Sequence, residues 1–292
     1  MNIYIVTDGG VALPQHLLYH PQLTIVPDTL RSGTFTLQQG ADVDTALISR
    51  VQSGHADLES EPGSVQTYIQ TYAHLSSSAD AIISIHSSTH LSDALKQAQL
   101  AVQHFAGSFP IEIINSKTTD LALGLLVEMA LSLVQAGESF EEIVNKLRHA
   151  TDRVYSLYHT SNSFALNKNE ICSTSHHVLA QMHQLGLIIS VEQGQLVLVE
   201  KAQTSQNAVE RLAEFILEFE QADIDACVIG QSFVTDANMV QKLAEQIGDD
   251  LEFNRFHVLN YSLTLSTYLG FDAFGIAILE AEHEQWESEY EN

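Results

Sequence analysis

Basic residues are scarce in this chain of 292 residues. Lysine and arginine together number 12, against 37 aspartates and glutamates, so the formal net charge at pH 7 is −25. Binding to a phosphate backbone relies on a cationic surface, so this balance argues strongly against a nucleic-acid partner. Anionic membrane surfaces are disfavoured for the same electrostatic reason.

Cysteine and long apolar runs are also sparse. Cys172 and Cys227 cannot form a disulfide framework in a chain this long, so we expect two inert thiols in a reducing compartment. The opening sequence MNIYIVTDGG has no basic region of the kind that begins a signal peptide. The longest apolar stretch, 121–134, is interrupted by Glu128 and is too short to span a bilayer. These features predict a cytoplasmic protein without membrane insertion.

The motifs of common nucleotide, hydrolase and metal sites are missing as well. There is no GxGxxG or GxxxxGK[ST] loop and no Gly-x-Ser-x-Gly elbow. His16 and His20 could share one helical face, but no third ligand is near them in the sequence. His176, His177 and His183 have no recognised zinc spacing. We therefore expect neither a metal ion nor a cofactor.

Apolar residues make up 45% of the chain and charged residues only 17%, which is enough for a substantial core. The first half alternates short β-rich runs with segments of helical periodicity. The expected strands are 3–6, 23–26, 81–85 and 111–114, and the expected helices are 65–75, 91–105 and 121–135. Strands separated by helices indicate a parallel sheet that is covered on its faces.

The second half has a different pattern. Segment 187–199 predicts a β-hairpin closed by a three-residue loop that contains Gly194. Helices are expected at 207–220 and 238–247, around a strand at 226–229, with further strands before residue 279. We therefore predict an α/β protein with a parallel-sheet N-terminal domain, residues 1–155, and a smaller α+β C-terminal domain, residues 156–292.

Small polar residues follow three of the expected parallel strands, in segments 7–10, 86–90 and 115–119. Ligands of open parallel sheets bind outside the carboxyl ends of the strands, so these turns favour a ligand at that edge. The most specific segment is 85–94, which contains the second of these turns. In it, Ser92 is placed to cap the following helix. The start of that helix could accept an anion, although capping alone also explains Ser92.

Taken together, these segments resemble the DegV family of lipid-binding proteins. Segment 7–14, TDGGVALP, is similar to the TDSSADLP opening of the family, and 59–63, ESEPG, stands where the family has TSQPS. Segment 87–94, SSTHLSDA, resembles the SSxLSGT stretch, and 114–143 follows the pattern DS…G-lv…AGxSxEEI. The resemblance covers essentially the whole chain in order.

This resemblance implies a carrier, not an enzyme, that holds one long-chain fatty acid or similar lipid in a tunnel between two domains. Each buried methylene contributes roughly 0.8 kcal/mol, so the acyl chain supplies most of the affinity and the polar head fixes the orientation. The implied partner is a fatty-acid kinase subunit, and no cofactor is implied. The implied lipid-binding residues are Ser87, Ser88, Ser92, Glu59, Ser60 and Tyr268.

Two of these positions, and one further position near the head group, depart from the family pattern. Glu59 stands in place of a threonine, Tyr268 in place of a histidine, and Glu170 falls in a segment where the family has glycine and arginine. A glutamate beside a buried carboxylate would form a like-charge pair. Glu59 must therefore turn outward, or the ligand head must be neutral, protonated or cationic. We expect lipid binding to be retained and transfer to a kinase to be impaired.

Two other interpretations stay open. One is an enzyme at the strand-end edge, with Asp8 as base, Ser87 or Ser88 as nucleophile, and His86 or His90 nearby. The other is a degenerate DegV-like protein whose tunnel is filled by its own side chains. A dry tunnel of acyl-chain length favours the carrier, a short polar pocket the enzyme, and solid packing the degenerate protein.

Overall fold

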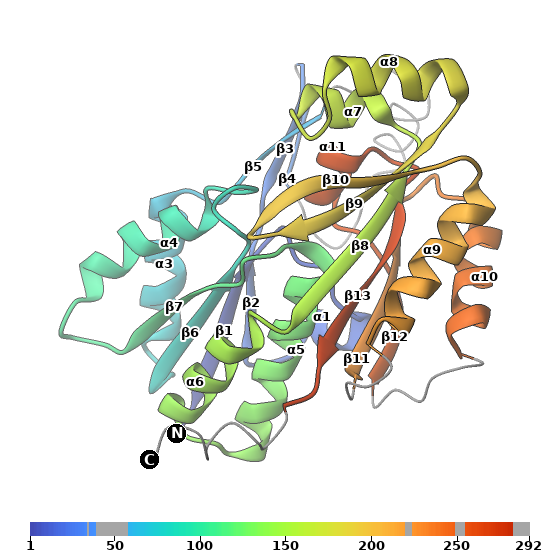
Figure 1. The fold of residues 1–292 in the computed structure, drawn as a ribbon. Coiled ribbons are helices and arrows are strands. Elements are labelled where there is room, and N and C mark those ends of the chain that lie inside the picture. Colours follow the sequence, from blue (N-terminus) through green and yellow to red (C-terminus); the bar gives the residue numbers. More distant parts are fainter. Residues whose placement is uncertain (34, 39–57, 220–223, 249–254, 283–292) are drawn as a thin grey trace, which may run out of the picture.

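The computed structural model describes residues 1–33, 35–38, 58–219, 224–248 and 255–282 (Figure 1). Within these residues the strands form three sheets, of four, six and three strands. No described helix combines the length and the apolar character that crossing a bilayer requires.

The first sheet is parallel, with the strand order β2-β1-β6-β7. Its strands are β1 (Ile3–Asp8), β2 (Leu23–Val26), β6 (Ala81–His86) and β7 (Ile111–Asn115). Every residue of β6 is buried, because helices cover both faces of the sheet. The continuous apolar runs of the sequence correctly predicted this arrangement.

Alternate residues of these strands pack against different helices. Val6 and Ile82 face α3 (Val65–Leu75) and α4 (Ala94–Val102). Ile5 and Ile83, one position away, face α5 (Asp120–Ala136) and α6 (Phe140–Ala150). This period of two residues assigns neighbouring side chains to opposite faces of the sheet. The parallel pairing of β1 and β6 places their carboxyl ends together at one edge. Two short helices complete this half of the chain, α1 (Gln15–Leu18) and η1 (Gln103–Phe105).

The second sheet is mixed, with the order β10-β9-β8-β13-β11-β12, in which β11 and β12 are parallel and the other pairs are antiparallel. Its strands are β8 (Val154–Thr160), β9 (Gly186–Glu192), β10 (Gln195–Ala202), β11 (Ile224–Gln231), β12 (Arg255–Asn260) and β13 (Phe274–Glu280). Helices α9 (Ser205–Leu217) and α10 (Ala237–Gly248) cover one face. The chain passes to this sheet between α6 and β8, so the predicted domain boundary at 155/156 lies inside β8.

The hairpin of β9 and β10 is tighter than predicted. Glu192 pairs with Gln195, so the loop has two residues instead of the expected three. Gln193 and Gly194 both have positive φ, 49° and 82°. This is the backbone of a two-residue hairpin turn whose twist matches that of its strands, and glycine adopts it without strain.

Three helices and a small sheet complete the second half and connect it to the first. The helices are α7 (Ser163–Lys168), α8 (Thr174–His183) and α11 (Leu263–Leu269). The small sheet has the order β4-β3-β5, with β3 (Thr29–Ser32), β4 (Phe35–Gln38) and β5 (Glu59–Glu61). The sequence pattern did not predict it. Strand β5 contacts α11, which joins the first and last parts of the chain.

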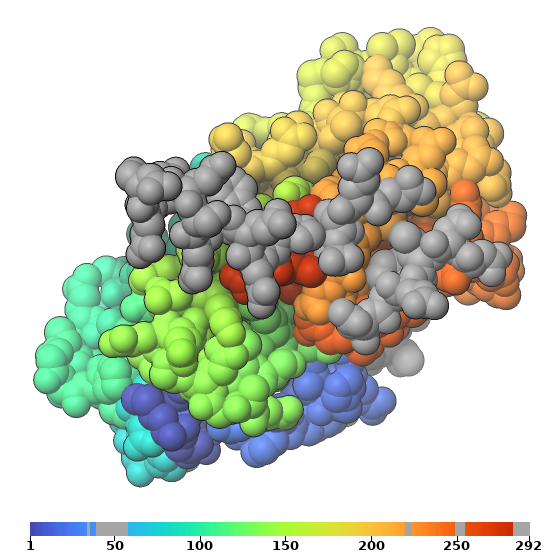
Figure 2. All heavy atoms as spheres, turned by 60° about the horizontal axis from the view of Figure 1, so that its bottom comes forward, coloured from blue at the N-terminus to red at the C-terminus, as the bar shows by residue number. Residues whose placement is uncertain are grey.

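Helix α5 lies between the two large sheets (Figure 1). It contacts β1 and β6 on one side and β8, β11 and β13 on the other. A helix buried on all sides is apolar all round, and α5 is almost entirely so. Figure 2 shows the two halves packed directly against each other, with residues coloured blue to green on one side and yellow to red on the other.

Candidate functional site

The carboxyl ends of β1 and β6 meet around the buried carboxylate of Asp8. Its Oδ1 accepts hydrogen bonds from the hydroxyl of Ser87 at 2.8 Å and from the N–H of Gly10 at 2.9 Å. Its Oδ2 accepts the N–H of Ser87 at 2.8 Å and lies 3.2 Å from Nδ1 of His86. Both carboxylate oxygens of Asp8 are therefore occupied by donors from the protein.

These donors keep Asp8 ionised in a buried position. Burial by itself raises the pKa of Asp8, but the hydrogen bond and charge of His86, followed by the bonds from Ser87, hold that pKa below its usual value. The network continues inward from Nε2 of His86, which lies 2.7 Å from the hydroxyl of Ser84, to the hydroxyl of Tyr72, a further 2.8 Å away. Ser87 is 1% exposed, so its hydroxyl is enclosed by this network and is out of reach of a substrate.

Ser88 holds the same turn against the second half of the chain. Its N–H donates to the carbonyl of Thr118 at 2.8 Å, and its hydroxyl accepts the N–H of His90 at 3.3 Å. A Cβ placed on Gly194 would lie 2.3 Å from the hydroxyl oxygen of Ser88. The tip of the β9–β10 hairpin is therefore packed directly on Ser88, and only glycine fits there.

Ser92 is close to the start of α4 but does not occupy the N-cap position expected for it. Helix α4 begins at Ala94, and Asp93 is its N-cap residue without a side-chain capping bond. The hydroxyl of Ser92 instead accepts the N–H of Ala94 at 3.1 Å, from one residue further back. Ser92 is half-buried. Its hydroxyl is therefore already engaged, because it accepts the N–H of Ala94, one of the first N–H groups of α4.

Strand β5 separates the two predicted residues Glu59 and Ser60. Adjacent residues of a strand point to opposite faces, and Glu59 is exposed whereas Ser60 is half-buried. The hydroxyl of Ser60 lies 3.2 Å from Oδ2 of Asp28 and 3.1 Å from the hydroxyl of Thr264. Glu59 therefore takes the outward of the two orientations that the sequence allowed.

Asp28 is the acidic residue that faces inward, and sequence reasoning missed it. It is 1% exposed, and its Oδ2 accepts the hydroxyl of Thr264 at 2.7 Å, whereas its Oδ1 makes no well-formed hydrogen bond with the described residues. Burial, followed by the charge of Asp8, raises the pKa of Asp28 to about 7 against the hydrogen bonds from Thr264, Ser60 and the backbone of Gly9. We call Asp28, Ser60 and Thr264 the Asp28 cluster.

Tyr268 and Glu170 line a pocket of about 250 Å³, and Tyr268 lies one helical turn after Thr264 on α11. The hydroxyl of Tyr268 donates to the carbonyl of Leu91 at 2.6 Å. Burial, followed by the charges of Asp28 and Asp93, raises the pKa of Tyr268. The full lining is His90, Leu91, Asn169, Glu170, Ile171, Gln195, Leu196 and Tyr268, which come from both halves of the chain.

An apolar layer runs from this pocket between α5, α11 and the inner face of the second sheet, and we call it the seam. Side chains of both halves fill its middle, including Leu91, Leu121, Leu125, Tyr158, Ile189, Leu196, Tyr261, Leu265 and Ala277. Three oxygens within it have no hydrogen-bond partner: Oδ1 of Asp120 and the hydroxyls of Tyr158 and Tyr261. A second pocket, of about 70 Å³, lies on the other flank of α11.

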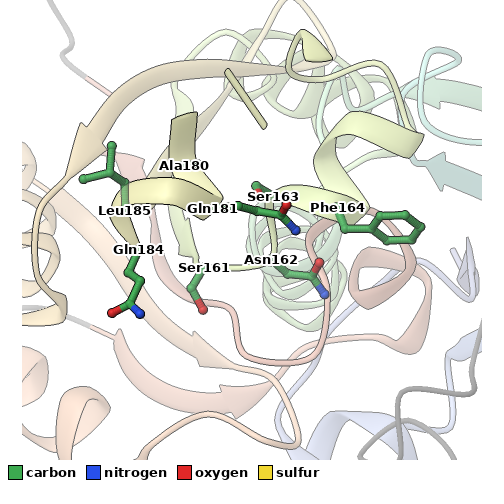
Figure 3. A pocket seen from close by; sticks show the side chains of 8 residues that line it. All are labelled: Ser161, Asn162, Ser163, Phe164, Ala180, Gln181, Gln184 and Leu185. Carbon is green, nitrogen blue, oxygen red and sulfur yellow. The ribbon is translucent and has the colours of Figure 1, made fainter. Parts of the chain in front are cut away.

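A larger pocket, of about 490 Å³, lies at α7 and α8 (Figure 3). All of its lining residues come from α7, α8 and the segments next to them, so it does not join the two halves. Phe164 at its rim is 65% exposed. Within the described residues, no group of three or more His, Cys, Asp or Glu is arranged to hold a metal ion.

Known proteins share this architecture. Residues 2–281 match the family model described as "Uncharacterised protein, DegV family". The chain belongs to the DegV family. A DegV domain-containing protein of Staphylococcus aureus is 25% identical over 282 residues, which cover 94% of this chain and 98% of that protein.

Solved structures of DegV proteins share the same fold. The chain is similar to a fatty-acid-binding DegV family protein from Thermus thermophilus, with a TM-score of 0.87, 19% identity, and coverage of 96% of this chain and 100% of the other. It is also similar to the fatty acid kinase B3 protein of Streptococcus pneumoniae loaded with linoleic acid, with a TM-score of 0.82, 22% identity, and coverage of 97% and 100%. These likenesses confirm the predicted α/β fold class and the resemblance seen in the sequence.

Within this DegV fold, the predicted site residues separate into four groups. Ser60 and Tyr268 lie beside the seam, and Ser92 lies near the start of α4. Ser87 and Ser88 are enclosed in the turn after β6, and Glu59 points outward. Their part in binding a ligand stays a prediction. The signal that could have revealed Asp28 is its place two positions after β2, another parallel strand that is followed by a polar residue.

Proposed function

We propose that this DegV family protein binds one long-chain fatty acid or similar lipid in the seam and acts as a carrier without a catalytic role. The observation that carries the proposal is the apolar seam. Tyr268 packs against the seam and lies one helical turn after Thr264 on α11, which brings the Asp28 cluster close to it. An apolar slot with a few polar groups at one end suits an amphipathic ligand. The fold shared with fatty-acid-binding DegV proteins supports the same ligand class.

The pocket beside Tyr268 would hold only part of such a ligand. Ligand sites usually measure about 300–1,000 Å³, and this pocket measures about 250 Å³. Leu91 and Leu196 belong both to the pocket and to the seam, so an acyl chain that enters there continues into the apolar layer. Each methylene buried there contributes roughly 0.8 kcal/mol, against the cost of moving the side chains that now fill the layer.

Transfer of the lipid to a fatty-acid kinase subunit is the second part of the proposal, and we infer that it is impaired. Glu170 and Tyr268 line the pocket where the head group would be presented, and Asp28 adds a further acid beside Ser60. Acidic side chains around the head group oppose the approach of a phosphate donor, because both are negatively charged. Normal phosphorylation in a strain that has lost its own carrier and receives this protein would refute the inference.

A cytoplasmic location remains a prediction from the sequence.

Mass spectrometry under native conditions tests lipid binding. The gently purified protein should carry the extra mass of one long-chain lipid, and the delipidated protein should take up oleic acid on titration. The absence of both would contradict the proposal.

A pair of matched variants locates the ligand. Ala277→Leu adds bulk inside the seam, whereas Ala213→Leu adds the same bulk between α9 and the opposite face of the second sheet. Each change costs about 1–3 kcal/mol of stability through overpacking. Only Ala277→Leu should reduce oleic acid uptake by the folded protein, and equal effects would place the ligand elsewhere.

The packed middle of the seam favours a second candidate, a DegV-like protein that holds no ligand. Tyr158 and Tyr261 meet there edge to face with their ring centroids 5.7 Å apart, as aromatic pairs do in ordinary cores. The native mass spectrum separates the two candidates, because a ligand-free protein would retain its bare mass at every oleic acid concentration.

A further inference from the structure

The Asp28 cluster contains a buried acceptor oxygen for which the described part of the chain supplies no well-formed hydrogen bond. Oδ2 of Asp28 accepts from Thr264 at 2.7 Å and faces Ser60 at 3.2 Å, but Oδ1 makes no well-formed hydrogen bond with the described residues although Asp28 is 1% exposed. The backbone of Gly9 also acts on this carboxyl group, but it lowers the pKa of Asp28 less than Thr264 and Ser60 do. Buried polar atoms in native proteins are almost always hydrogen-bonded, so an orphaned carboxylate oxygen calls for a donor from outside the protein. A donor on a bound ligand would meet this need.

Among the described residues, the groups around Asp28 offer no positive charge to a ligand anion. Asp8 on β1 is ionised, and its charge acts on Asp28, while His86 behind it is already engaged by Asp8. Tyr68 of α3 and Tyr268 of α11 both feel the charge of Asp28, and their pKa values are raised, so both stay neutral.

The charged residues of the small sheet turn away from the Asp28 cluster. Arg31 of β3 points to solvent, where it pairs with Glu61 of β5 at 2.8 Å, and Glu59 is also exposed. A lipid carboxylate beside the Asp28 cluster would therefore face two aspartates without a compensating cation. Like charges at short range cannot both remain ionised, so one proton must be shared or the anion must leave.

We propose that the Asp28 cluster selects lipids whose head group shares or donates a proton to Asp28, such as an undissociated fatty acid, a long-chain alcohol or a long-chain amine, and rejects the free carboxylate anion. This inference rests on the proposed lipid binding and specifies its head group. With a fatty acid, the two carboxyl groups hold one proton between them. An alcohol donates its O–H to Oδ1, and an ammonium group donates an N–H.

A shared proton makes fatty-acid binding depend on pH. Burial and the charge of Asp8 raise the pKa of Asp28 to about 7. Below that pH the proton is already on Asp28, and the affinity for a fatty acid is flat. Above it, the complex must take up a proton, so the affinity falls about tenfold for each pH unit. The affinity for an alcohol varies much less, and the affinity for an amine rises as Asp28 ionises.

Equilibrium dialysis of the delipidated full-length protein against radiolabelled oleic acid, oleyl alcohol and oleylamine tests this inference between about pH 6.5 and 8.5. We expect the oleic acid affinity of the native protein to fall about tenfold per pH unit above pH 7, with no such fall for oleyl alcohol. An oleic acid affinity that stays constant over this range would overturn the inference. If none of the three lipids binds, the proposed lipid binding itself fails.

Variants assign the effect to Asp28. Asp28→Asn should bind oleic acid with little pH dependence, because its amide donates to the anion at every pH. Asp28→Leu removes both the proton and the charge, so it should also abolish the pH dependence of oleic acid binding. This variant replaces Asp28→Asn in the test if Asp28→Asn folds poorly. The control Asp152→Asn makes the same chemical change in a surface pair with Lys117 and should keep the native profile. A native profile in both Asp28 variants would contradict the assignment.

Discussion

Two buried aspartates at the same edge of the first sheet have opposite electrostatic properties. Asp8 is surrounded by donors from Gly10, His86 and Ser87, which hold its pKa below the usual value. Asp28 has donors at only one oxygen, and its pKa is raised to about 7. The number of donors, more than burial itself, decides which carboxylate stays ionised. Asp8 therefore has a structural role, and Asp28 is the residue that we propose contacts the ligand head group.

Replacing Asp8 should destabilise the protein strongly. Asp8→Ala leaves the N–H groups of Gly10 and Ser87 and the ring of His86 without their acceptor in a buried place. We expect the free energy of unfolding in urea to fall by about 3 kcal/mol or more. The control Asp152→Ala removes an exposed ion pair with Lys117 and should cost less than about 1 kcal/mol. Similar losses in the two variants would show that the network around Asp8 contributes little.

Asp120 should make stability fall as pH rises. Burial raises its pKa from 3.8 to about 7, against the hydrogen bonds from Ser262. Between these two values the folded chain holds a proton that the unfolded chain has lost, so folding weakens by about 1 kcal/mol per pH unit. Asp120→Asn removes this term and keeps a similar shape.

The difference between wild type and Asp120→Asn isolates this effect. His159 acts in the opposite direction, because burial lowers its pKa to about 4 and its protonation favours the unfolded chain at acid pH. The contributions of His159 and Asp28 cancel in the difference. Urea unfolding between about pH 5 and 7 should show the wild type losing stability relative to the variant as pH rises. A constant difference would mean that Asp120 titrates normally.

At the scale of elements, α5 determines how the two halves fit. It is packed on one side by β1 and β6 and on the other by β8, β11 and β13. Gly124 lets its backbone approach the turn after β1 closely, since a Cβ there would lie 2.0 Å from the carbonyl oxygen of Ala12. The position of α5 in turn sets the width of the seam.

Gly124→Ala tests this close approach. The new methyl group meets backbone instead of a flexible side chain, so we expect a loss of about 1–3 kcal/mol of stability. Gly248→Ala at the end of α10 is the control, because its Cβ would meet nothing within 4 Å. The control should be neutral or stabilising by up to about 1 kcal/mol, since alanine favours helix. Thermal unfolding of both variants measures the contrast, and equal melting temperatures would contradict it.

Sequence patterns predicted the elements whose signal is local. The parallel strands β1 and β6 are continuous apolar runs, and their polar ends predicted the meeting of the segments around Asp8 and Ser87. Strands β3 and β5 escaped prediction because they are short and gain their partners from the fold. Asp28 escaped because Thr264, its closest donor, lies 236 positions away in the chain. Long-range pairs of this kind leave no periodic signal in one sequence.

At the scale of the whole molecule, the net charge of −25 disfavours anionic ligands, as the Asp28 cluster does locally. A negative surface repels anionic ligands and anionic partners over about one Debye length, roughly 8 Å at physiological salt. A lipid anion would therefore meet repulsion during its approach and again beside Asp28. A protonated or neutral lipid avoids both the repulsion by the surface and the repulsion beside Asp28, so burial of its acyl chain in the apolar seam can supply the affinity.

The crystal structure of the protein prepared with oleic acid tests the central claim most directly. We predict continuous density for an acyl chain between α5, α11 and the second sheet, with Leu265 and Tyr261 displaced from their present packing and the carboxyl group beside Asp28. A seam in which Tyr158, Tyr261 and Leu265 keep the packing described here, with no lipid or with lipid only on the outer surface, would contradict the account.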